Sequence, residues 1–252
     1  MSERKKLSVT IITFNEERRI RDALESVKWA DEIVVIDSFS TDRTVNICRE
    51  YTQLVYQIPW HGYVEQKNLA TAKTSHDWVL NIDADEVVSE PLIAEIQQAL
   101  AASSDVVGYF IPRRTHYLDD WIRHCGWYPD AKLRLFDKRC GKWVGKALHE
   151  KIEVQGKTAD LRHDLYHYTY EDISDHLKTI NNYTSIAASQ KDESIGGAGI
   201  FLRTLLTFLK KYLLKQGFRD GTRGMIVCLL SAFTVAVKYA KVWELQQKKG
   251  HD

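Results

Sequence analysis

The chain has 252 residues, of which 44% are hydrophobic and 27% are charged, which is an ordinary globular composition and excludes a disordered or fibrous protein. The formal net charge of +1 provides no overall attraction for nucleic acid, so we expect no nucleic-acid partner. The four cysteines show no C-x-x-C spacing, which predicts reduced thiols rather than a disulfide framework.

The N-terminus has a basic start followed by an apolar run, as a signal peptide does. The run is short, contains Ser8, Thr10 and Thr13, and leads into "NEE" without a small-residue cleavage pattern. We therefore interpret it as a first strand and expect a cytoplasmic protein.

Strand-like and helix-like stretches alternate through the first hundred residues. Runs of β-branched and other apolar residues predict strands over 7–14, 32–38, 53–57 and 78–83. Apolar residues at helical spacing predict helices over 16–30, 40–51 and 63–75. Ser40 or Thr41 is expected to cap the second helix. A fourth helix is expected to start at Ser89, with Pro91 in its first turn.

The pattern changes after residue 105. Strands are predicted over 106–114 and 131–138, separated by an irregular aromatic stretch that is suited to gripping a ligand. A helix is predicted over 172–189, and from residue 200 two helices are expected, broken around Gly217, Gly221 and Gly224. Alternating units predict an α/β fold with a mostly parallel sheet flanked by helices, followed by a C-terminal helical appendage.

Polar side chains follow three of the predicted strands. Asn15 and Glu16 follow the first, Asp37 the second, and Asp83 and Asp85 the fourth. Ligands of an open parallel sheet bind beyond the carboxyl ends of its strands, so these side chains should converge. Paired carboxylates suit Mg²⁺ or Mn²⁺. The alternative is a solvated turn with an acidic helix N-terminus, which needs no metal.

Several motifs in register resemble a known family. "VTIITFNEE", "IVVIDSFSTDRT", "QKNLA", "WVLNIDADE" and "LRLF" are similar, in this order, to the inverting family 2 glycosyltransferases of the GT-A (Rossmann-like) fold. The match covers about residues 7 to 170. A narrower resemblance, carried by "GWYPDAKLRLF", "WVGKALHE" and "KKYLLKQGFRDGTRGM", is to bacterial lipopolysaccharide-core β-glucosyltransferases.

The resemblance implies a role for each matching position. Asp37 would bond the base, usually uracil, unless it is a turn residue. The edge of the first strand would contact the nucleoside, through Thr13, Asn15 and Glu16, although Asn15 also suits a helix N-cap. Lys67 would approach the diphosphate together with Asn68, with a solvated helix lysine as the alternative.

The metal and its surroundings follow from the same resemblance. Asp83 would lie near the ribose or the metal, and Asp85 would bind the metal directly. A late histidine often joins the metal in this fold; His163 and His167 are candidates, and His167 is preferred because it ends a strand-like run. A structural histidine is the alternative. Arg134 would face the diphosphate or pair with an acid.

An inverting transfer requires a general base for the acceptor hydroxyl. In this family the base lies in an x-E-D-like motif, and the corresponding stretch here is "KALHEKI", where His149 and Glu150 replace the acidic pair. We assign Glu150 as the base, with Asp130 and Asp172 as alternatives. Asp172 also stands where a helix N-cap is expected.

Aromatic residues of the irregular stretch suit an acceptor sugar, because a ring stacks on the apolar face of a saccharide. The candidates are Trp121, Trp127 and Tyr128, and simple packing is the alternative reading.

The C-terminal stretch 201–215 has apolar residues on one helical face and basic residues elsewhere. This pattern predicts a basic amphipathic helix that lies on an anionic inner-membrane surface, peripherally. Helices packed on each other or on a second subunit of a homo-oligomer are an equal alternative. The apolar run 225–237 is shorter than the ~20 residues that span a bilayer.

We therefore predict a catalytic domain over 1–190, with a nucleotide-binding half (1–105) and an acceptor-binding half (106–190), and a basic helical extension over 191–252. The predicted enzyme moves a hexose, with glucose favoured, from a UDP-sugar to a lipid-linked or core-oligosaccharide acceptor. Two alternatives are a sugar-nucleotide nucleotidyltransferase, which should carry a Gly-rich phosphate loop that "TFNEERR" lacks, and a non-catalytic nucleotide-binding module.

Overall fold

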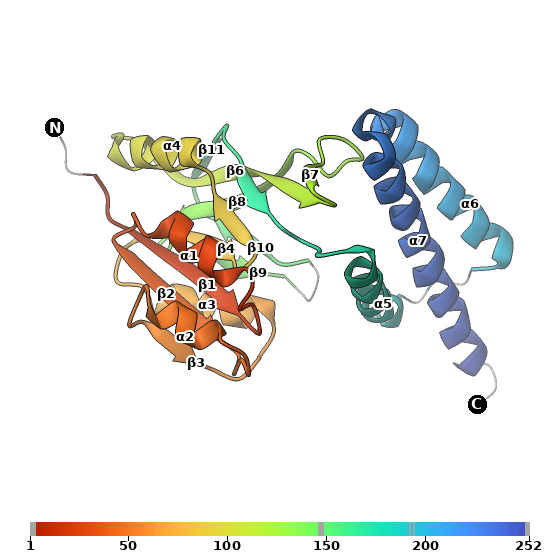
Figure 1. The fold of residues 1–252 in the computed structure, drawn as a ribbon, viewed down its shortest axis with the longest axis horizontal. Helices are drawn as coiled ribbons and strands as arrows, with labels where there is room; N and C mark the ends of the chain where they lie inside the picture. The colour runs from red at the N-terminus through yellow and green to blue at the C-terminus, as the bar shows by residue number, and fades with distance from the viewer. Residues whose placement is uncertain (1–3, 146–148, 192, 194, 250–252) are drawn as a thin grey trace. The chain divides into compact units, whose positions relative to one another are not determined.

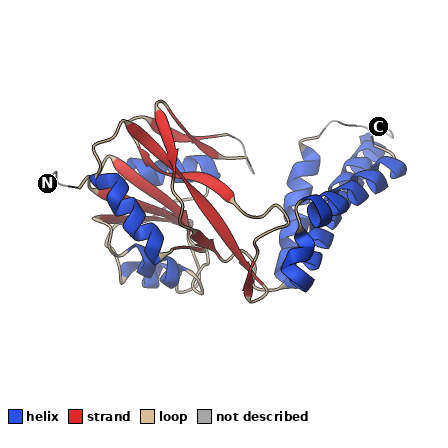
Figure 2. Cartoon of the chain, turned by 90° about the horizontal axis from the view of Figure 1, so that it is seen from above, coloured by secondary structure: helices blue, strands red, loops and turns tan. Residues whose placement is uncertain are grey.

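The computed structural model describes residues 4–145, 149–191, 193 and 195–249 (Figure 1). The chain forms two compact units. The sheet unit comprises Met1–Arg114 and Asp130–His167, and the helical unit comprises Thr115–Pro129 and Tyr168–Asp252. Figure 2 colours helices blue and strands red. These units do not test the functional halves predicted from the sequence, which stay a prediction.

Four parallel strands begin the sheet unit, in the order β3-β2-β1-β4. They are β1 (Leu7–Thr13), β2 (Glu32–Asp37), β3 (Val55–Gln57) and β4 (Trp78–Asp83). The connecting helices are α1 (Ile20–Val27), α2 (Thr44–Arg49) and α3 (Tyr63–Ala72). All seven residues of β1 are buried, as expected for a central strand of a sheet covered on both faces. The predicted alternation of strands and helices is confirmed.

Later strands extend this sheet with antiparallel pairing. β8 (Asp130–Asp137) pairs with β4, and β6 (Val106–Tyr117) pairs with β8. The sheet path then ends with β12 (Leu165–His167) beside β5 (Glu86–Val88). The remaining strands are short: β7 (Asp120–Trp121), β9 (Gly141–Val144), β10 (Lys151–Val154) and β11 (Lys157–Asp160). The sequence analysis does not predict β5, although this strand helps to build the site.

Helix boundaries match the sequence in one case and depart from it in others. α4 (Glu90–Ala101) begins after Ser89, whose Oγ accepts from the backbone N–H of Leu92, as predicted. The expected cap of α2 is wrong, because Arg43 occupies that position without a side-chain bond. Ser40 and Thr41 instead bond to residues at the strand ends.

The helical unit consists of α5 (Ile173–Ser189), α6 (Gly197–Leu209) and α7 (Gly221–Lys249), with a π-helical turn and a 3-10 turn between α6 and α7. The expected break at Gly217 and Gly221 is confirmed, whereas Gly224 lies inside α7. A small core joins the segment 115–129 to α7. Its buried members are Tyr117, Ile122, Cys125, Val227 and Cys228.

The apolar run 225–237, predicted to be too short for a bilayer, lies inside α7. Gly217–Lys248 is long and apolar enough to cross a membrane, judged by length and composition alone. Core helices of soluble proteins pass the same test, but only 28% of this window is buried. The length of the run therefore does not decide whether the segment enters a membrane.

His176 gives the helical unit a pH-dependent stability. Its ring stacks on Tyr170 with centroids 4.0 Å apart, and its Nδ1 lies 2.9 Å from the hydroxyl of Tyr117. Burial lowers the pKa of His176 from 6.5 to about 4, outweighing the opposite effect of Asp175. The unfolded chain then binds a proton that the folded chain does not.

The free energy of unfolding should consequently fall as the pH decreases from 6.5 to 4. The stabilising contribution of the buried, neutral His176 is fully present above pH 6.5. Its size is about 3 kcal/mol, from 1.36 kcal/mol per pKa unit. Denaturant titration of the wild type and His176→Gln across this pH range measures it. The difference between the two should shrink toward acid pH, and parallel pH profiles would contradict the assignment.

Candidate functional site

Three polar strand ends meet at one edge of the sheet. In the parallel register, Thr13 of β1 stands beside Asp37 of β2, and Ile12 stands beside Asp83 of β4. The convergence expected at the carboxyl ends of the strands is present. The residues that follow these strands, including the predicted Asn15 and Asp85, extend from the same edge.

Asp83 is held between two buried cations. Its Oδ1 lies 2.9 Å from Nζ of Lys67, and its Oδ2 lies 2.8 Å from Nη2 of Arg134. Burial alone would raise the pKa of Asp83, but the charges of Arg134 and Lys67 outweigh it and hold the pKa well below its usual value. Arg134 therefore pairs with an acid, which is the second of its two predicted roles.

Glu86 is fully buried and also ion-paired. Its Oε1 lies 2.9 Å from Nη2 of Arg134 and 3.3 Å from Nη1 of Arg113, and its Oε2 accepts from the backbone N–H of Asp83 at 2.9 Å. A buried carboxylate requires such partners. The crowding of acids at this strand end is thus balanced for Asp83 and Glu86 by the chain's own basic residues. Sequence reasoning gave Glu86 no such role.

Asp85 forms no ion pair with these cations within the described residues and pairs with a histidine instead. Its Oδ2 lies 3.2 Å from Nε2 of His167, because β12 pairs with β5 in a register that sets His167 opposite Glu86. The other ring nitrogen of His167, Nδ1, is buried without a hydrogen-bond partner among the described residues. His163 lies elsewhere, with its Nδ1 2.8 Å from Glu95 of α4.

The Asp85 and His167 pair fits a divalent cation in part. A carboxylate oxygen and an imidazole nitrogen are both ligands of Mn²⁺, and Mg²⁺ is commonly held by one or two carboxylates together with substrate phosphates. Within the described part of the chain, no group of three His, Cys, Asp or Glu side chains is arranged to hold a metal. Two protein ligands therefore require a phosphate-bearing substrate to complete the site.

The three candidate bases have different surroundings. Oε1 of Glu150 lies 3.9 Å from Nζ of Lys67, which places Glu150 in the same cluster as Asp83. Residues 146–148 of its motif lie outside the described residues. Asp172 caps α5, accepting from the backbone N–H of Asp175 at 2.8 Å.

Asp130 is tied to two basic residues, Arg113 at 2.6 Å and Lys132 at 3.0 Å. Burial alone would raise the pKa of Asp130. The charge of Arg113 and the hydrogen bond between Asp130 and Lys132 outweigh burial, so the net pKa of Asp130 is below normal. A carboxylate with a lowered pKa is a weaker proton acceptor. This lowered pKa counts against Asp130 as the base, and the assignment of Glu150 stays a prediction.

The predicted nucleoside edge is built from mutually bonded loops. Asp37 is fully buried and accepts from the backbone N–H of Ser40 at 2.9 Å and from Gln57 at 3.2 Å. Asn15, at a φ of 55°, accepts from the backbone N–H of Thr41 at 2.8 Å. These bonds fasten the loop after β1 to the loop after β2. The predicted contact of Asp37 with a base stays a prediction.

Two other members of this edge differ in their partners. The hydroxyl of Thr13 is buried without a hydrogen-bond partner among the described residues. The backbone N–H of Glu16 donates to the hydroxyl of Thr44 at 2.8 Å, which joins the same two loops. A buried hydroxyl without a partner is uncommon, so Thr13 has bonding capacity that the described chain leaves unused.

Trp143 supports the cluster and is missed by sequence reasoning. Nζ of Lys67 lies 4.4 Å from the centroid of its ring, and the guanidinium of Arg134 lies 5.9 Å from it. Asn68 bonds both the carbonyl and the N–H of the Trp143 backbone, at 2.9 and 3.0 Å. Asn68 thus holds this tryptophan in place, and its predicted place beside the diphosphate stays a prediction. In the sequence, the only indication of a role for Asn68 is its position next to Lys67 on a predicted helix.

The predicted acceptor residues belong to the helical unit. Trp127 packs against its core, with ring centroids 5.6 Å from Tyr117 and 6.0 Å from His176. Trp121 packs edge-on against His116 at 5.0 Å. Tyr128 precedes a cis proline. Packing thus explains the two tryptophans within this unit, and the acceptor role of all three residues stays a prediction.

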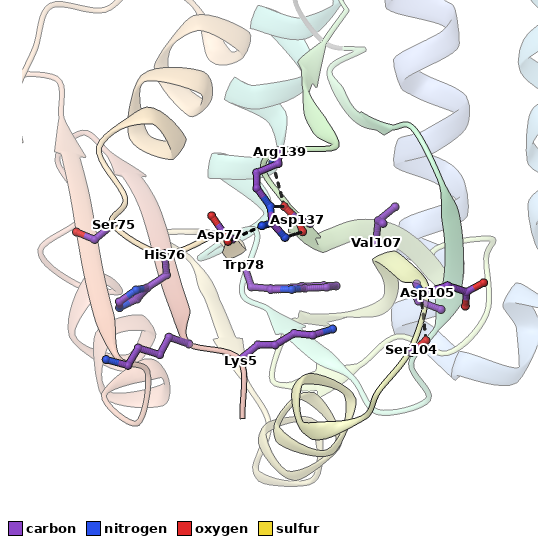
Figure 3. A pocket seen from close by; sticks show the side chains of 12 residues that line it. Lys5, Ser75, His76, Asp77, Trp78, Ser104, Asp105, Val107, Asp137 and Arg139 are labelled. Carbon is purple, nitrogen blue, oxygen red and sulfur yellow. Dashed lines mark hydrogen bonds and ion pairs between the residues drawn. The ribbon is translucent and has the colours of Figure 1, made fainter. Parts of the chain in front are cut away.

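A cavity of about 480 Å³ lies at another place in the sheet unit (Figure 3). Its lining includes Lys5, Trp78 and Val106, which lie just before or at the starts of β1, β4 and β6. Arg139 spans part of it, pairing with Asp137 and with Asp77 at 2.9 Å. The acidic cluster lies at the opposite ends of β1 and β4, so this cavity is separate from the candidate site.

Two known proteins resemble the chain over nearly its whole length. The chain is 30% identical over 254 residues to the lipopolysaccharide core biosynthesis glycosyltransferase LpsC of Rhizobium meliloti, covering 94% of this chain and 92% of that protein. It is 31% identical over 259 residues to the uncharacterized glycosyltransferase RT0209 of Rickettsia typhi, covering 97% and 89%.

Solved structures give weaker likenesses. The first 349 residues of TarS from S. aureus, in complex with UDP-GlcNAc, align with a TM-score of 0.49 and 14% identity, covering 97% of this chain and 92% of that one. Glucosyl-3-phosphoglycerate synthase from Mycobacterium tuberculosis, with Mg²⁺ and UDP, aligns with a TM-score of 0.38 and 25% identity over 44% of each chain. Residues 8–153 match the glycosyl transferase family 2 domain, and the chain belongs to this family of enzymes.

Proposed function

We propose that this protein transfers a hexose, with glucose favoured, from a UDP-sugar to a saccharide hydroxyl with inversion at the anomeric carbon. The observation that carries the proposal is the placement of Asp85 and His167 together, beside the ion-paired Asp83, at the carboxyl ends of parallel strands in a family 2 domain. The name of the Rhizobium relative supports a lipopolysaccharide-core acceptor.

Asp83 and Asp85 have different roles in this proposal. Asp83 is kept as a carboxylate by Lys67 and Arg134, which orient both of its oxygens, so it is suited to accept a hydrogen bond from a ribose hydroxyl. Asp85 and His167 would hold Mg²⁺ or Mn²⁺. When bound, the metal supplies positive charge that stabilises the departing diphosphate.

Glu150 completes the proposed chemistry as general base. It takes the proton from the acceptor hydroxyl as that oxygen attacks the anomeric carbon from the face opposite the diphosphate. Lys67, 3.9 Å from Glu150 and 2.9 Å from Asp83, holds the two acids at a short distance from each other. The nucleoside would contact the loops that carry Asn15 and Asp37.

The donor is tested by measuring UDP release from UDP-glucose, UDP-galactose and UDP-N-acetylglucosamine with a truncated lipopolysaccharide acceptor, with Mn²⁺ and with EDTA. We expect UDP-glucose to react fastest, EDTA to abolish turnover, and NMR of the product to show a β linkage. Formation of UTP and a sugar phosphate from UDP-glucose and pyrophosphate would instead indicate a nucleotidyltransferase. Binding of UDP without turnover of any donor would indicate a binding module.

The proposed location is the cytoplasm, peripherally at the inner membrane, where a lipid-linked acceptor would be met. The support for this part is the apolar and basic character of the helical unit.

A further inference from the structure

α6 carries a band of large apolar side chains that the structure leaves exposed. None of its thirteen residues is buried. Phe201, Leu205 and Leu209 form one row at a spacing of four residues, and Leu202 and Leu206 form the adjacent row. Phe201 is 69% exposed and Leu206 is 54% exposed. The turn that follows adds Leu214, which is 78% exposed.

This amount of exposed apolar surface on one helix is unusual for a soluble monomer. Phe208 and Tyr212 lie on the same helical side as Phe201 and Leu205, and they pack against the core of the helical unit together with Val227 and Cys228 of α7. α6 is thus packed on α7, as Figures 1 and 2 show, and Phe201, Leu202 and Leu206 remain more than half exposed beside this contact.

Basic residues outnumber acidic ones around this band, and Glu193, which precedes α6, pairs with Arg203. Between Glu193 and Asp220 the sequence contains no acidic residue, but it contains the basic residues Arg203, Lys210, Lys211, Lys215 and Arg219. Lys210 and Lys215 are exposed and form no ion pair within the described residues. Asp220 is directed inward, with its Oδ1 2.7 Å from Nδ1 of His124.

We propose that α6 and the turn after it, residues 197–215, form a surface that lies in the plane of an anionic lipid membrane. The apolar rows would enter the boundary between headgroups and acyl chains, and Lys210 and Lys215 would bind lipid phosphates. This inference concerns binding alone and does not depend on which sugar the protein transfers.

The basic residues favour a lipid surface over a second copy of this chain. A symmetric dimer through α6 would bring two identical basic bands face to face, and like charges across an interface are unfavourable. A lipid surface with anionic headgroups removes this repulsion.

α7 is a poorer candidate for the membrane contact, because polar bonds tie it to α5. Nζ of Lys241 donates to the carbonyl of Asn181 at 2.7 Å and to the hydroxyl of Thr184 at 2.9 Å. A spanning α7 would break these bonds or carry a polar helix into the bilayer, where unsatisfied polar groups are costly. The surface is therefore assigned to α6, lying flat.

The test is co-sedimentation of the full chain with vesicles of phosphatidylcholine alone and of phosphatidylcholine with phosphatidylglycerol. We expect binding to the anionic vesicles only. Leu206→Glu should weaken it by about tenfold or more, as expected from the loss of one buried leucine side chain. Lys210→Ser with Lys215→Ser should weaken it by about fivefold per lysine. The matched control is Ile186→Glu, at an exposed apolar position of α5 that is 41% exposed, and it should bind as the wild type does.

Each other outcome overturns the proposal. Equal binding to both vesicle types would show that the basic residues do not contribute to binding. A loss in Ile186→Glu as large as that in Leu206→Glu would show that α6 is not the specific contact surface. A dimer that Leu206→Glu dissociates, without vesicle binding, would make the band an interface between copies. A wild type that requires detergent to stay in solution would point to a spanning α7. Far-ultraviolet circular dichroism and UDP binding of each variant verify that it is folded, and vesicle binding is measured without donor sugar.

Discussion

Glu150→Gln is expected to lower kcat by about 10²–10⁴-fold, because a glutamine amide of nearly the same shape cannot accept the proton of the acceptor hydroxyl. The KM for the donor should change little, since the proposed role begins only as the acceptor oxygen attacks. Steady-state kinetics with UDP-glucose and calorimetric titration of UDP separate these two effects.

The matched controls are Asp130→Asn and Asp172→Asn. Asp172 is the N-cap of α5, and asparagine also caps helices, so this variant should keep both its stability and its kcat. Asp130 pairs with Arg113 and Lys132, and its loss should not remove proton transfer. A large loss of kcat in Asp130→Asn with normal kcat in Glu150→Gln would assign the base to Asp130.

Asp85→Asn is expected to lower kcat/KM by about 10²–10³-fold at a fixed Mn²⁺ concentration, because it removes a charged ligand from the side of the site that meets the diphosphate. Calorimetry should show that UDP binds the wild type more tightly with Mn²⁺ than with EDTA, and that the variant loses this difference. His167→Gln should reduce the same difference, because only two side chains of the described chain meet here.

Asp105→Asn is the control for this series. Asp105 lies in the same unit, its side chain is 75% exposed and it pairs only with Lys157 in the structure, so UDP binding and its response to Mn²⁺ should match the wild type. Metal-independent UDP binding by the wild type, unchanged in Asp85→Asn, would refute the metal site and leave the solvated-turn interpretation of the acidic cluster.

The two aspartates of the cluster should also respond differently to mutation, because their neighbours differ. Asp83 compensates two buried cations, so its removal would leave Lys67 and Arg134 without their shared partner inside the sheet unit. Within the described residues, Asp85 forms an ion pair with His167 alone. The cluster is therefore a buried salt-bridge network around Asp83 and Glu86, and Asp85 pairs with His167 beside it.

Local pattern was sufficient for the first half of the sheet unit. The runs that became β1, β2 and β4 are apolar and β-branched, and α4 has a Ser cap with a proline in its first turn. These signals involve neighbouring residues, so they can be interpreted without knowing the fold. A parallel order of strands then places Thr13, Asp37 and Asp83 at one edge.

The sequence alone therefore determined the family, the alternation of strands and helices, and the acids that end β4. The tertiary structure decided the partners of those acids. His167 reaches Asp85 because two three-residue strands, too short to leave a pattern, pair across about eighty positions of the chain. Arg134 and Trp143 join the cluster for the same reason: contacts between distant segments depend on how strands align, and charge and packing select them only after the chain has folded.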